Sequence, residues 1–251
     1  VDSGRPASRY ARGIESVVRR AVPEAENALI VGLGTGLIPR RLERMGIDVE
    51  VVEIDPIIRD LFQRYFNVDE RRFPIHIGDA RQFVQQAERS WDVIVLDAFS
   101  GDSVPAHLVT EEAFGLFADR LNGDGLMVVN LVTLVGRDAM APLAAVIRTF
   151  RQAFAHSRTL SAEGADREAE LANVLLTGSH RPAPLTRLTA VPDAGLDWYV
   201  EQLLEQPLEI PLENAPVLTD DRNPIEALMA ESALVWRRNI LGSWNPEFLI
   251  D

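Results

Sequence analysis

Apolar and polar segments alternate along the first 160 residues of this 251-residue chain. Short, mostly apolar runs predict buried strands, and stretches with an apolar residue every three or four positions predict helices between them. The predicted strands cover residues 28–32, 48–54, 73–77, 91–97 and 124–132, and the predicted helices cover 37–45, 56–66, 79–88, 110–121 and 137–151. This alternation is typical of a parallel, doubly wound α/β sheet.

Two later segments predict the strands that close this sheet. Residues 153–160 and 171–177 are rich in apolar residues, and a polar turn separates them. We expect them to form an antiparallel pair, which gives an α/β fold with a mostly parallel, seven-stranded sheet and an antiparallel closing strand. The cluster NGDG at residues 122–125 predicts a turn before the fifth strand.

The first predicted strand runs into a glycine-rich turn, Gly32-Leu33-Gly34-Thr35-Gly36. Glycines at a strand-to-helix turn let backbone N–H groups approach a ligand, and an acid about 20 residues later, here Glu53, can accept both hydroxyls of a ribose. The pattern therefore predicts a nucleoside ligand. Leu37 stands where the dinucleotide fingerprint G-x-G-x-x-G has its last glycine. The G-x-G-x-G spacing favours a nucleoside without a pyrophosphate, such as S-adenosylmethionine, over NAD.

The composition of the chain changes after Gly178, where prolines become frequent. We expect helices near 195–205 and 224–238 in this later part. The predicted parts are an N-terminal lead-in over residues 1–26, a nucleoside-binding Rossmann-like domain over 27–178, and a proline-rich helical extension over 179–251 that packs on the core.

Three acidic residues mark the ends of predicted strands: Glu53, Asp79 and Asp97. Ligands in open α/β sheets bind in the crevice beyond these strand ends. The carboxylate of Asp79 could accept from the amino group of adenine, while the backbone N–H of Ala80 meets a ring nitrogen. Each acid also has a plainer interpretation, with Asp79 as the N-cap of a helix and Glu53 as a solvated loop charge.

Asp97 begins the segment DAFSGDSVPAHL, which contains a second acid, Asp102. An alkyl amine has a pKa of about 10.4, so it must lose a proton before its nitrogen can attack the carbon next to a sulfonium. One carboxylate can orient the ammonium and take this proton, and another can hold the amine in line. We therefore predict Asp97 and Asp102 as catalytic residues. The alternative is that Asp97 caps the loop and Asp102 is solvated.

Other side chains near this segment are weaker candidates. His107 could act as a base, but a lone histidine in such a turn more often has a structural role. Phe99 and Tyr10 could form a wall against the base or the substrate, whereas we expect Trp91 to pack in the core.

Residues 218–224, LTDDRNP, form a polar cluster within the apolar, proline-rich tail. Thr219 or Asp221 could cap the helix that follows. Alternatively, Asp220 or Asp221 could reach the mouth of the site and bind a cationic substrate.

Charge and composition narrow the class of function. The formal net charge of −13 disfavours nucleic acid as a partner and permits a cationic substrate such as a polyamine. The chain has no cysteine, and its four histidines are scattered, so we expect no metal site. No apolar run approaches the roughly 20 residues of a membrane helix, and the first residues lack the apolar core of a signal peptide. We therefore expect a cytoplasmic enzyme without a membrane partner.

Five short motifs occur together between residues 28 and 135. They are VGLGTG at 31–36, VEIDP at 52–56, GDAR at 78–81, WDVIVLDAF at 91–99, and a P-A-x-L turn followed by T-x-E-A-F at 110–114. In this combination they resemble the spermidine synthase family, which consists of aminopropyltransferases built on a class I methyltransferase fold.

The resemblance implies decarboxylated S-adenosylmethionine or S-adenosylmethionine as co-substrate. It implies Glu53 at the ribose, Asp79 and Ala80 at the adenine, and Asp97 as the acid that orients and deprotonates the amine. The co-substrate would lie against Gly32, Gly34, Thr35, Gly36, Glu53, Ile54, Asp79, Ala80 and Asp97.

The chain departs from the family pattern in three places. Thr35 stands where family members usually have an acid that grips the amino group of the decarboxylated co-substrate. Ser100 replaces the second acid of the usual Asp-x-x-Asp arrangement, and Asp102 is the next acid. The N-terminal strand domain of the family, with its gating tyrosine and glutamine, is not recognisable.

We therefore expect aminopropyl transfer from decarboxylated S-adenosylmethionine to a small amine or polyamine such as putrescine. The alternatives are methyl transfer from S-adenosylmethionine and a non-catalytic, nucleoside-binding relative. The resemblance and the apolar tail WNPEFLI are also compatible with a homodimer.

Overall fold

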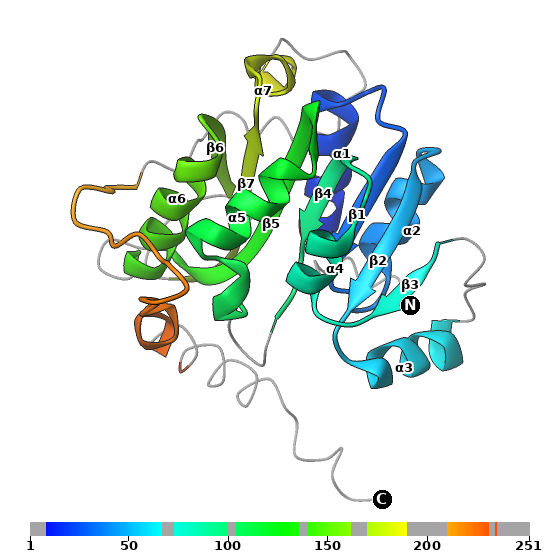
Figure 1. Cartoon of the computed structure of the whole chain (residues 1–251), viewed down its shortest axis with the longest axis horizontal. Coiled ribbons are helices and arrows are strands. Elements are labelled where there is room, and N and C mark those ends of the chain that lie inside the picture. Colours follow the sequence, from blue (N-terminus) through cyan, green and yellow to red (C-terminus); the bar gives the residue numbers. More distant parts are fainter. Residues whose placement is uncertain are drawn as a thin grey trace, which may run out of the picture.

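The structure is a computed structural model that describes residues 9–66, 73–99, 104–135, 140–161, 170–189, 210–230 and 234. Within these residues, seven strands form one sheet in the order β3-β2-β1-β4-β5-β7-β6 (Figure 1). The strands are β1 (Asn27–Val31), β2 (Asp48–Glu53), β3 (Ile75–Ile77), β4 (Trp91–Leu96), β5 (Leu121–Val135), β6 (His156–Ser161) and β7 (Glu170–Ser179). The strands from β3 to β5 run parallel, and β7 runs antiparallel to β5 and β6. The predicted mostly parallel sheet with an antiparallel closing pair is confirmed.

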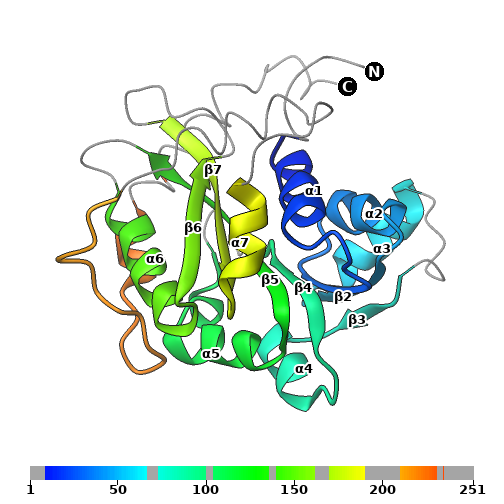
Figure 2. The ribbon, with the colours of Figure 1, turned by 90° about the horizontal axis from the view of Figure 1, so that it is seen from above.

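Helices cover both faces of the sheet (Figures 1 and 2). Buried side chains of α4, α5 and α6 pack on one face, together with Leu218, Ile225 and Met229 from later in the chain. Those of α1, α2 and α7, and Phe62 of α3, pack on the other face. The helices are α1 (Arg9–Ala21), α2 (Leu37–Arg44), α3 (Pro56–Phe66), α4 (Ala80–Gln86), α5 (Glu111–Asp119), α6 (Ala141–Ala153), α7 (Pro182–Thr189) and the short 3₁₀ helix η1 (Ala106–Leu108).

The central strands are apolar on both sides because helices cover both of their faces. The last four residues of β1 and of β4 are buried, and Trp91 at the start of β4 is buried as predicted. Such strands present polar side chains to a ligand only where they end. The parallel arrangement therefore brings Glu53 at the end of β2 and Asp97 after β4 to one edge of the sheet.

The expected turn at residues 122–125 is wrong. These residues lie inside β5, which begins at Leu121. The pairing with β4 shifts there, from Trp91 opposite Leu121 to Val93 opposite Leu126. A bulge takes up extra residues in one strand without ending it, and glycines suit its irregular backbone.

The segment expected as a lead-in contains helix α1. Its apolar residues recur at helical spacing and are completely buried on the face of the sheet that α2 and α7 also cover; they are Ile14, Val17, Val18 and Ala21. This amphipathic pattern was present in the sequence. Tyr10 in the first turn of this helix forms a hydrogen bond with the side chain of Asp97.

The proline-rich part of the chain also contains helices. Pro182 and Pro184 lie in the first turn of α7, where backbone N–H groups have no helical partner and proline does no harm. Residues 225–230 are helical, within the range expected from 224 to 238, whereas the helix expected at 195–205 lies outside the described residues. Helix α6 begins at Ala141, and residues 136–139 of the predicted helix lie outside the described ranges as well. None of the described helices has the length and apolar character required to cross a membrane.

Candidate active site

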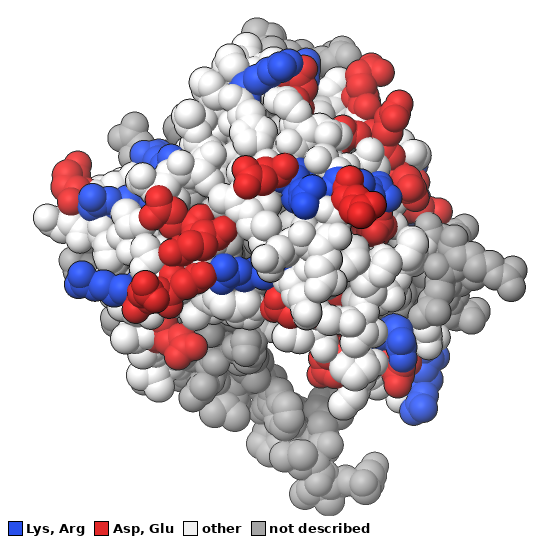
Figure 3. Space-filling model, viewed as in Figure 1, with Lys and Arg blue, Asp and Glu red and all other residues white. Residues whose placement is uncertain are grey.

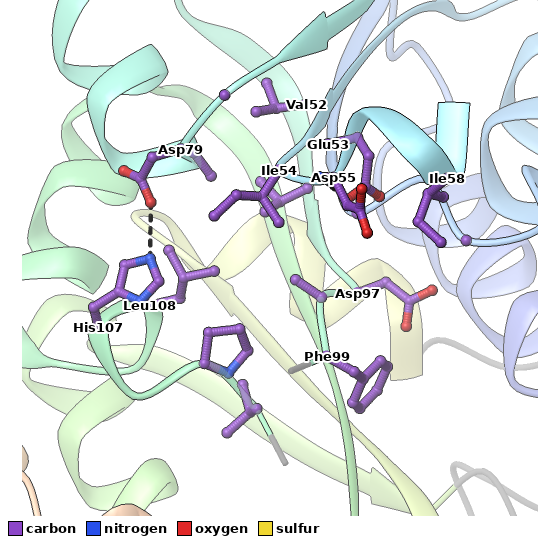
Figure 4. Close-up of a pocket in the computed structure, with 18 of the residues that line it drawn as sticks. Val52, Glu53, Ile54, Asp55, Ile58, Asp79, Asp97, Phe99, His107 and Leu108 are labelled. Carbon is purple, nitrogen blue, oxygen red and sulfur yellow. Dashed lines mark hydrogen bonds and ion pairs between the residues drawn. The ribbon is translucent and has the colours of Figure 1, made fainter. Parts of the chain in front are cut away.

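A cavity of about 690 Å³ lies at the carboxyl ends of the parallel strands. Its walls come from the glycine loop after β1, the β2–α3 junction, the start of α4, the segment after β4, and η1 (Figure 4). One further lining residue, Glu226, comes from the C-terminal part of the chain. A much smaller cavity of about 20 Å³ adjoins the loop and is lined by Tyr10 and Thr35 among others. Gly32, Gly34 and Asp97 line both cavities, so Asp97 lies where they meet.

Gly32 allows the end of β1 to touch the backbone that follows β4. Its φ angle is +98°, and a Cβ atom there would lie 2.3 Å from the carbonyl oxygen of Asp97. Only glycine fits this contact. The glycine therefore fixes how closely Asp97 approaches the loop.

Gly36 has a different position from the other loop glycines. It is buried, lines neither cavity, and is the N-cap of α2 with a φ angle of +68°. A Cβ atom at this position would lie 2.1 Å from the ring of Phe62. The structure thus accounts for Gly36 by helix packing, whereas Gly34 and Thr35 are exposed at the loop surface.

Glu53 is only 8% exposed and joins the glycine loop to the end of β2. Its Oε2 accepts from the backbone N–H of Leu33 at 2.9 Å, and its Oε1 accepts from that of Asp55 at 2.9 Å. Each carboxylate oxygen has a second acceptor position, so both can still bind a ligand hydroxyl. Ile54, the next residue, is 66% exposed and lines the cavity.

Asp79 caps a helix and lines the cavity at the same time. It is the N-cap of α4, where its Oδ1 accepts from the backbone N–H of Gln82 at 2.9 Å, and it also lines the cavity beside Ala80. Its Oδ2 pairs with Nε2 of His107 at 2.8 Å, as the dashed line in Figure 4 shows. Burial alone would raise the pKa of Asp79, but donation from Gln82 and His107 holds that pKa below its usual value. The carboxylate is therefore ionised and fixed in orientation.

Asp97 is partly buried and has two hydrogen-bond donors. The amide Nδ2 of Asn130 on β5 donates to its Oδ1 at 2.7 Å, and the hydroxyl of Tyr10 on α1 donates to the same carboxylate. Burial raises the pKa of Asp97 to about 7, although both donors favour the ionised form and act in the opposite direction. A carboxylate with this pKa can exchange a proton near neutral pH.

Comparison with known proteins adds a family to this geometry. A family model described as the spermine/spermidine synthase domain matches residues 7–157, more than half of the chain. The chain belongs to this family. The resemblance noted from the five motifs is therefore confirmed.

Curated relatives of the chain carry two kinds of name. The chain is 35% identical over 183 residues to an N-terminal histidine N-methyltransferase of Emericella nidulans, and the aligned region covers 68% of this chain and 32% of the relative. It is 29% identical to a probable polyamine aminopropyl transferase of Bifidobacterium longum, over 81% of this chain and 49% of the relative. The chain thus spans about a third of the length of the first of these curated relatives and about half of the second.

Solved structures share the fold. A spermidine synthase from Thermotoga maritima superposes with a TM-score of 0.65 at 19% identity, covering 82% of this chain and 72% of that one. Human methyltransferase-like protein 13, in complex with SAH, superposes with a TM-score of 0.53 at 18% identity, covering 82% and 95%. Both comparisons support the class I methyltransferase-like architecture.

Several predicted residues of this family site are placed outside the cavity or outside the described ranges. Asp102, the second predicted acid, lies outside the described residues. Asp220 does not line the large cavity, and both of its carboxylate oxygens bind Arg81. Neither Thr219 nor Asp221 caps the helical residues 225–230; the side chain of Asn223 accepts from the backbone N–H of Ile225 at 3.1 Å instead.

The structure also adds residues that sequence reasoning missed as site residues. The sequence predicts Tyr10 only as an aromatic wall and gives no prediction for Asn130 or Glu226. Asn130 had a signal, since it interrupts the apolar strand β5 one position after Val129, which pairs with Leu96, the residue before Asp97. Once the strand register is known, an amide beside Asp97 follows.

The large cavity of this family member is strongly acidic. Its described lining includes five carboxylates, from Glu53, Asp55, Asp79, Asp97 and Glu226, and no arginine; the chain contains no lysine at all. The outer face over α4 to α6 differs, because arginines are interspersed there with acids (Figure 3). Clefts lined by one sign of charge concentrate ligands of the opposite sign. Among the described residues, no cluster of three or more histidine or acidic side chains is arranged to hold a metal.

Proposed function

We propose that the protein transfers an aminopropyl group from decarboxylated S-adenosylmethionine to an amine acceptor such as putrescine. The acidic lining of the cavity is the observation that carries this proposal. Decarboxylated S-adenosylmethionine and an alkyl amine both carry positive charge, and neither brings a carboxylate that would need a cationic partner. The carboxylates of the described lining, without an arginine among them, suit both molecules.

Asp97 would act as the base of this reaction. The nitrogen of the acceptor attacks the carbon next to the sulfonium, the C–N bond forms as the C–S bond breaks, and the bonding pair returns to sulfur. The product nucleoside is then a neutral thioether. The proton that leaves the acceptor ammonium passes to the carboxylate of Asp97, whose pKa of about 7 lies close to the working pH.

The remaining lining residues would hold the nucleoside. Glu53 would accept from the ribose hydroxyls, and its two bonds to backbone N–H groups orient it before the ligand arrives. Asp79 would accept from the amino group of adenine, with the backbone N–H of Ala80 beside it. Gly32 and Gly34 would allow the ligand to approach the loop, and Ile54 would cover the base.

Methyl transfer from S-adenosylmethionine is the second candidate function. Thr35 favours it, because the glycine loop offers the small cavity a neutral hydroxyl rather than an acid for the amino group of an aminopropyl chain. The relatives from Emericella nidulans and Xenopus laevis, the latter named as an eEF1A lysine and N-terminal methyltransferase, also fit this candidate.

The product nucleoside separates the two reactions. Purified protein supplied with putrescine and decarboxylated S-adenosylmethionine should release methylthioadenosine, measured by liquid chromatography. If the first reaction yields no methylthioadenosine, and the protein releases S-adenosylhomocysteine from S-adenosylmethionine, then its function is methyl transfer and not aminopropyl transfer. If the protein binds both nucleosides but forms neither product with a panel of amines, it is a non-catalytic relative.

The variant Asp97→Asn controls for contaminating activity in this assay. It should reduce turnover at least about a hundredfold, the usual scale for losing a general base, and leave the dissociation constant of the nucleoside nearly unchanged. Asp119→Asn, at an exposed position on α5 that does not line the cavity, should leave both quantities unchanged.

A further inference from the structure

The polar cluster at residues 218–224 has no role in the reaction described above, yet its side chains make specific contacts with the site. We propose that Asp220 is a positioning residue of the nucleoside site, which holds the start of α4 against η1 and so fixes Asp79 where the adenine base is read. This inference rests on the proposed role of Asp79. It assigns the segment 218–229 to the site rather than to a peripheral tail.

Asp220 joins two parts of the chain that are 139 residues apart. The guanidinium of Arg81 donates from Nη1 to Oδ1 at 2.8 Å and from Nη2 to Oδ2 at 2.7 Å, a two-pronged geometry that gives the strongest and most directional ion pairs. The hydroxyl of Thr110 donates to Oδ1 at 2.8 Å, and the backbone N–H of Asp220 donates to Glu112 at 3.0 Å. We call the Arg81–Asp220 pair the clasp.

The clasp is connected directly to the base-reading acid. Arg81 is two residues after Asp79 in the first turn of α4, and its Nη1 also donates to the carbonyl oxygen of His107 at 3.1 Å. The ring of His107 pairs in turn with Asp79 at 2.8 Å. His107 is therefore held at its backbone by Arg81 and at its ring by Asp79, so the start of α4 and η1 keep one relative position.

A third contact closes this arrangement. The side chain of Asn223 donates from Nδ2 to the carbonyl oxygen of Ala106 at 2.7 Å. Each of the three joined segments contributes to the large cavity, through Asp79, His107 and Glu226 respectively. Leu218 at the start of the polar cluster, and Ile225 and Met229 after its end, are buried in the core and anchor this segment.

The clasp also controls where the charge of Arg81 acts. Asp220 raises the pKa of Arg81, and Arg81 lowers the pKa of Asp220, so the pair is fully ionised. The negative charge of Asp79 also raises the pKa of Arg81. Without the carboxylate of Asp220, the guanidinium would be free to bind Asp79 and would compete there with His107 and with the amino group of adenine.

The test compares Asp220→Asn with Asp221→Asn, an adjacent exposed acid for which the structure shows no partner among the described residues. Isothermal titration calorimetry measures the dissociation constants of methylthioadenosine and of its hypoxanthine analogue, which has an oxygen in place of the amino group. Asp220→Asn should weaken binding of the adenine nucleoside on the order of tenfold and bind the analogue nearly as before. Asp221→Asn should match the unaltered protein with both nucleosides.

Two results would overturn the inference: unchanged binding in Asp220→Asn, or an equal loss for both nucleosides, which would mean a merely structural role. Arg81→Met, alone and combined with Asp220→Asn, gives an independent check, because partners in one clasp should show strongly non-additive losses of affinity.

The test measures binding, so its outcome can be separated from that of the proposed function. If the protein forms no methylthioadenosine but its preference for the adenine nucleoside depends on Asp220, the proposed function is wrong and the clasp stands. If the protein forms methylthioadenosine and Asp220→Asn keeps the same preference, the proposed function stands and the clasp is wrong. A protein that binds neither nucleoside would overturn both.

Discussion

Asp97 owes its chemistry to the groups around it rather than to its position alone. It is an acid whose burial favours the protonated form, and its two donors, Asn130 and Tyr10, favour the ionised form. A base must be ionised to accept a proton, so turnover should rise as the pH increases through about 7. The same burial and the nearby negative charge raise the pKa of Tyr10, which stays neutral and continues to donate.

The variant Asn130→Leu tests this balance at the level of one side chain. It removes the donor that stabilises the ionised form, so the pKa of Asp97 should rise and the pH–rate profile should move to higher pH by about half a unit or more. The measurement is kcat as a function of pH at saturating substrates.

Thr133→Val is the matched control on the same strand. The hydroxyl of Thr133 is buried without a hydrogen-bond partner among the described residues, so replacing it should leave the profile in place and should not reduce stability. If the two variants have the same profile, Asn130 does not set the pKa of Asp97.

At the scale of elements, the glycine loop and the end of β4 form one unit through the contact of Gly32 with the carbonyl of Asp97. Gly32→Ala would add a Cβ atom 2.3 Å from that oxygen and would also strain the backbone at φ +98°. We expect the loop or Asp97 to move, with turnover reduced at least tenfold and the free energy of unfolding lowered by about 2–4 kcal/mol.

Gly46→Ala separates the strain from the contact. Gly46 has a similar φ of +87°, but no described atom lies within 4 Å of the position that a Cβ would occupy, so only the backbone penalty applies. Chemical denaturation should show a loss of about 1 kcal/mol for this variant, with full turnover. An equal effect of both substitutions on turnover would show that the Gly32 contact does not position Asp97.

The sequence predicted those elements whose apolar pattern is decided locally. The parallel strands follow from burial on both faces, and the strand-end rule places Glu53, Asp79 and Asp97 at the end of the sheet where all three line the cavity. The start of β5 was missed because its glycines suit a bulge as well as a turn, and only pairing with β4 decides between them. The partners of Asp97 come from strand register and from the docking of α1, and neither can be read from local pattern.

At the scale of the whole molecule, the buried carboxylate of Asp97 lowers the free energy of unfolding when it is ionised. Burial raises the pKa of Asp97 from 3.8 to about 7, so the folded protein holds that proton more tightly than the unfolded chain does. The stabilisation from this proton is present below about pH 4 and is lost as the pH rises towards 7 and above. Functional acids in partly buried sites commonly reduce stability in this way.

Asp97→Asn should therefore gain stability relative to the unaltered protein as the pH increases. Thermal unfolding at pH 6 and pH 8 should show a difference in Tm between the two proteins that is about 2–4 °C larger at pH 8, which corresponds to about 1 kcal/mol for a chain of this size. Asp119→Asn should show no such dependence. A difference in Tm that is constant between the two pH values would mean that Asp97 does not titrate in this range.

The clasp has a consequence for the order in which the protein is made. Synthesis proceeds from the N-terminus, and all seven strands are complete at Ser179, well before Asp220 is added. At that stage Arg81 still lacks its partner Asp220, and η1 lacks the contact with Asn223. If the clasp positions Asp79 as proposed, affinity for the nucleoside would arise only after Asp220 has been added, late in translation.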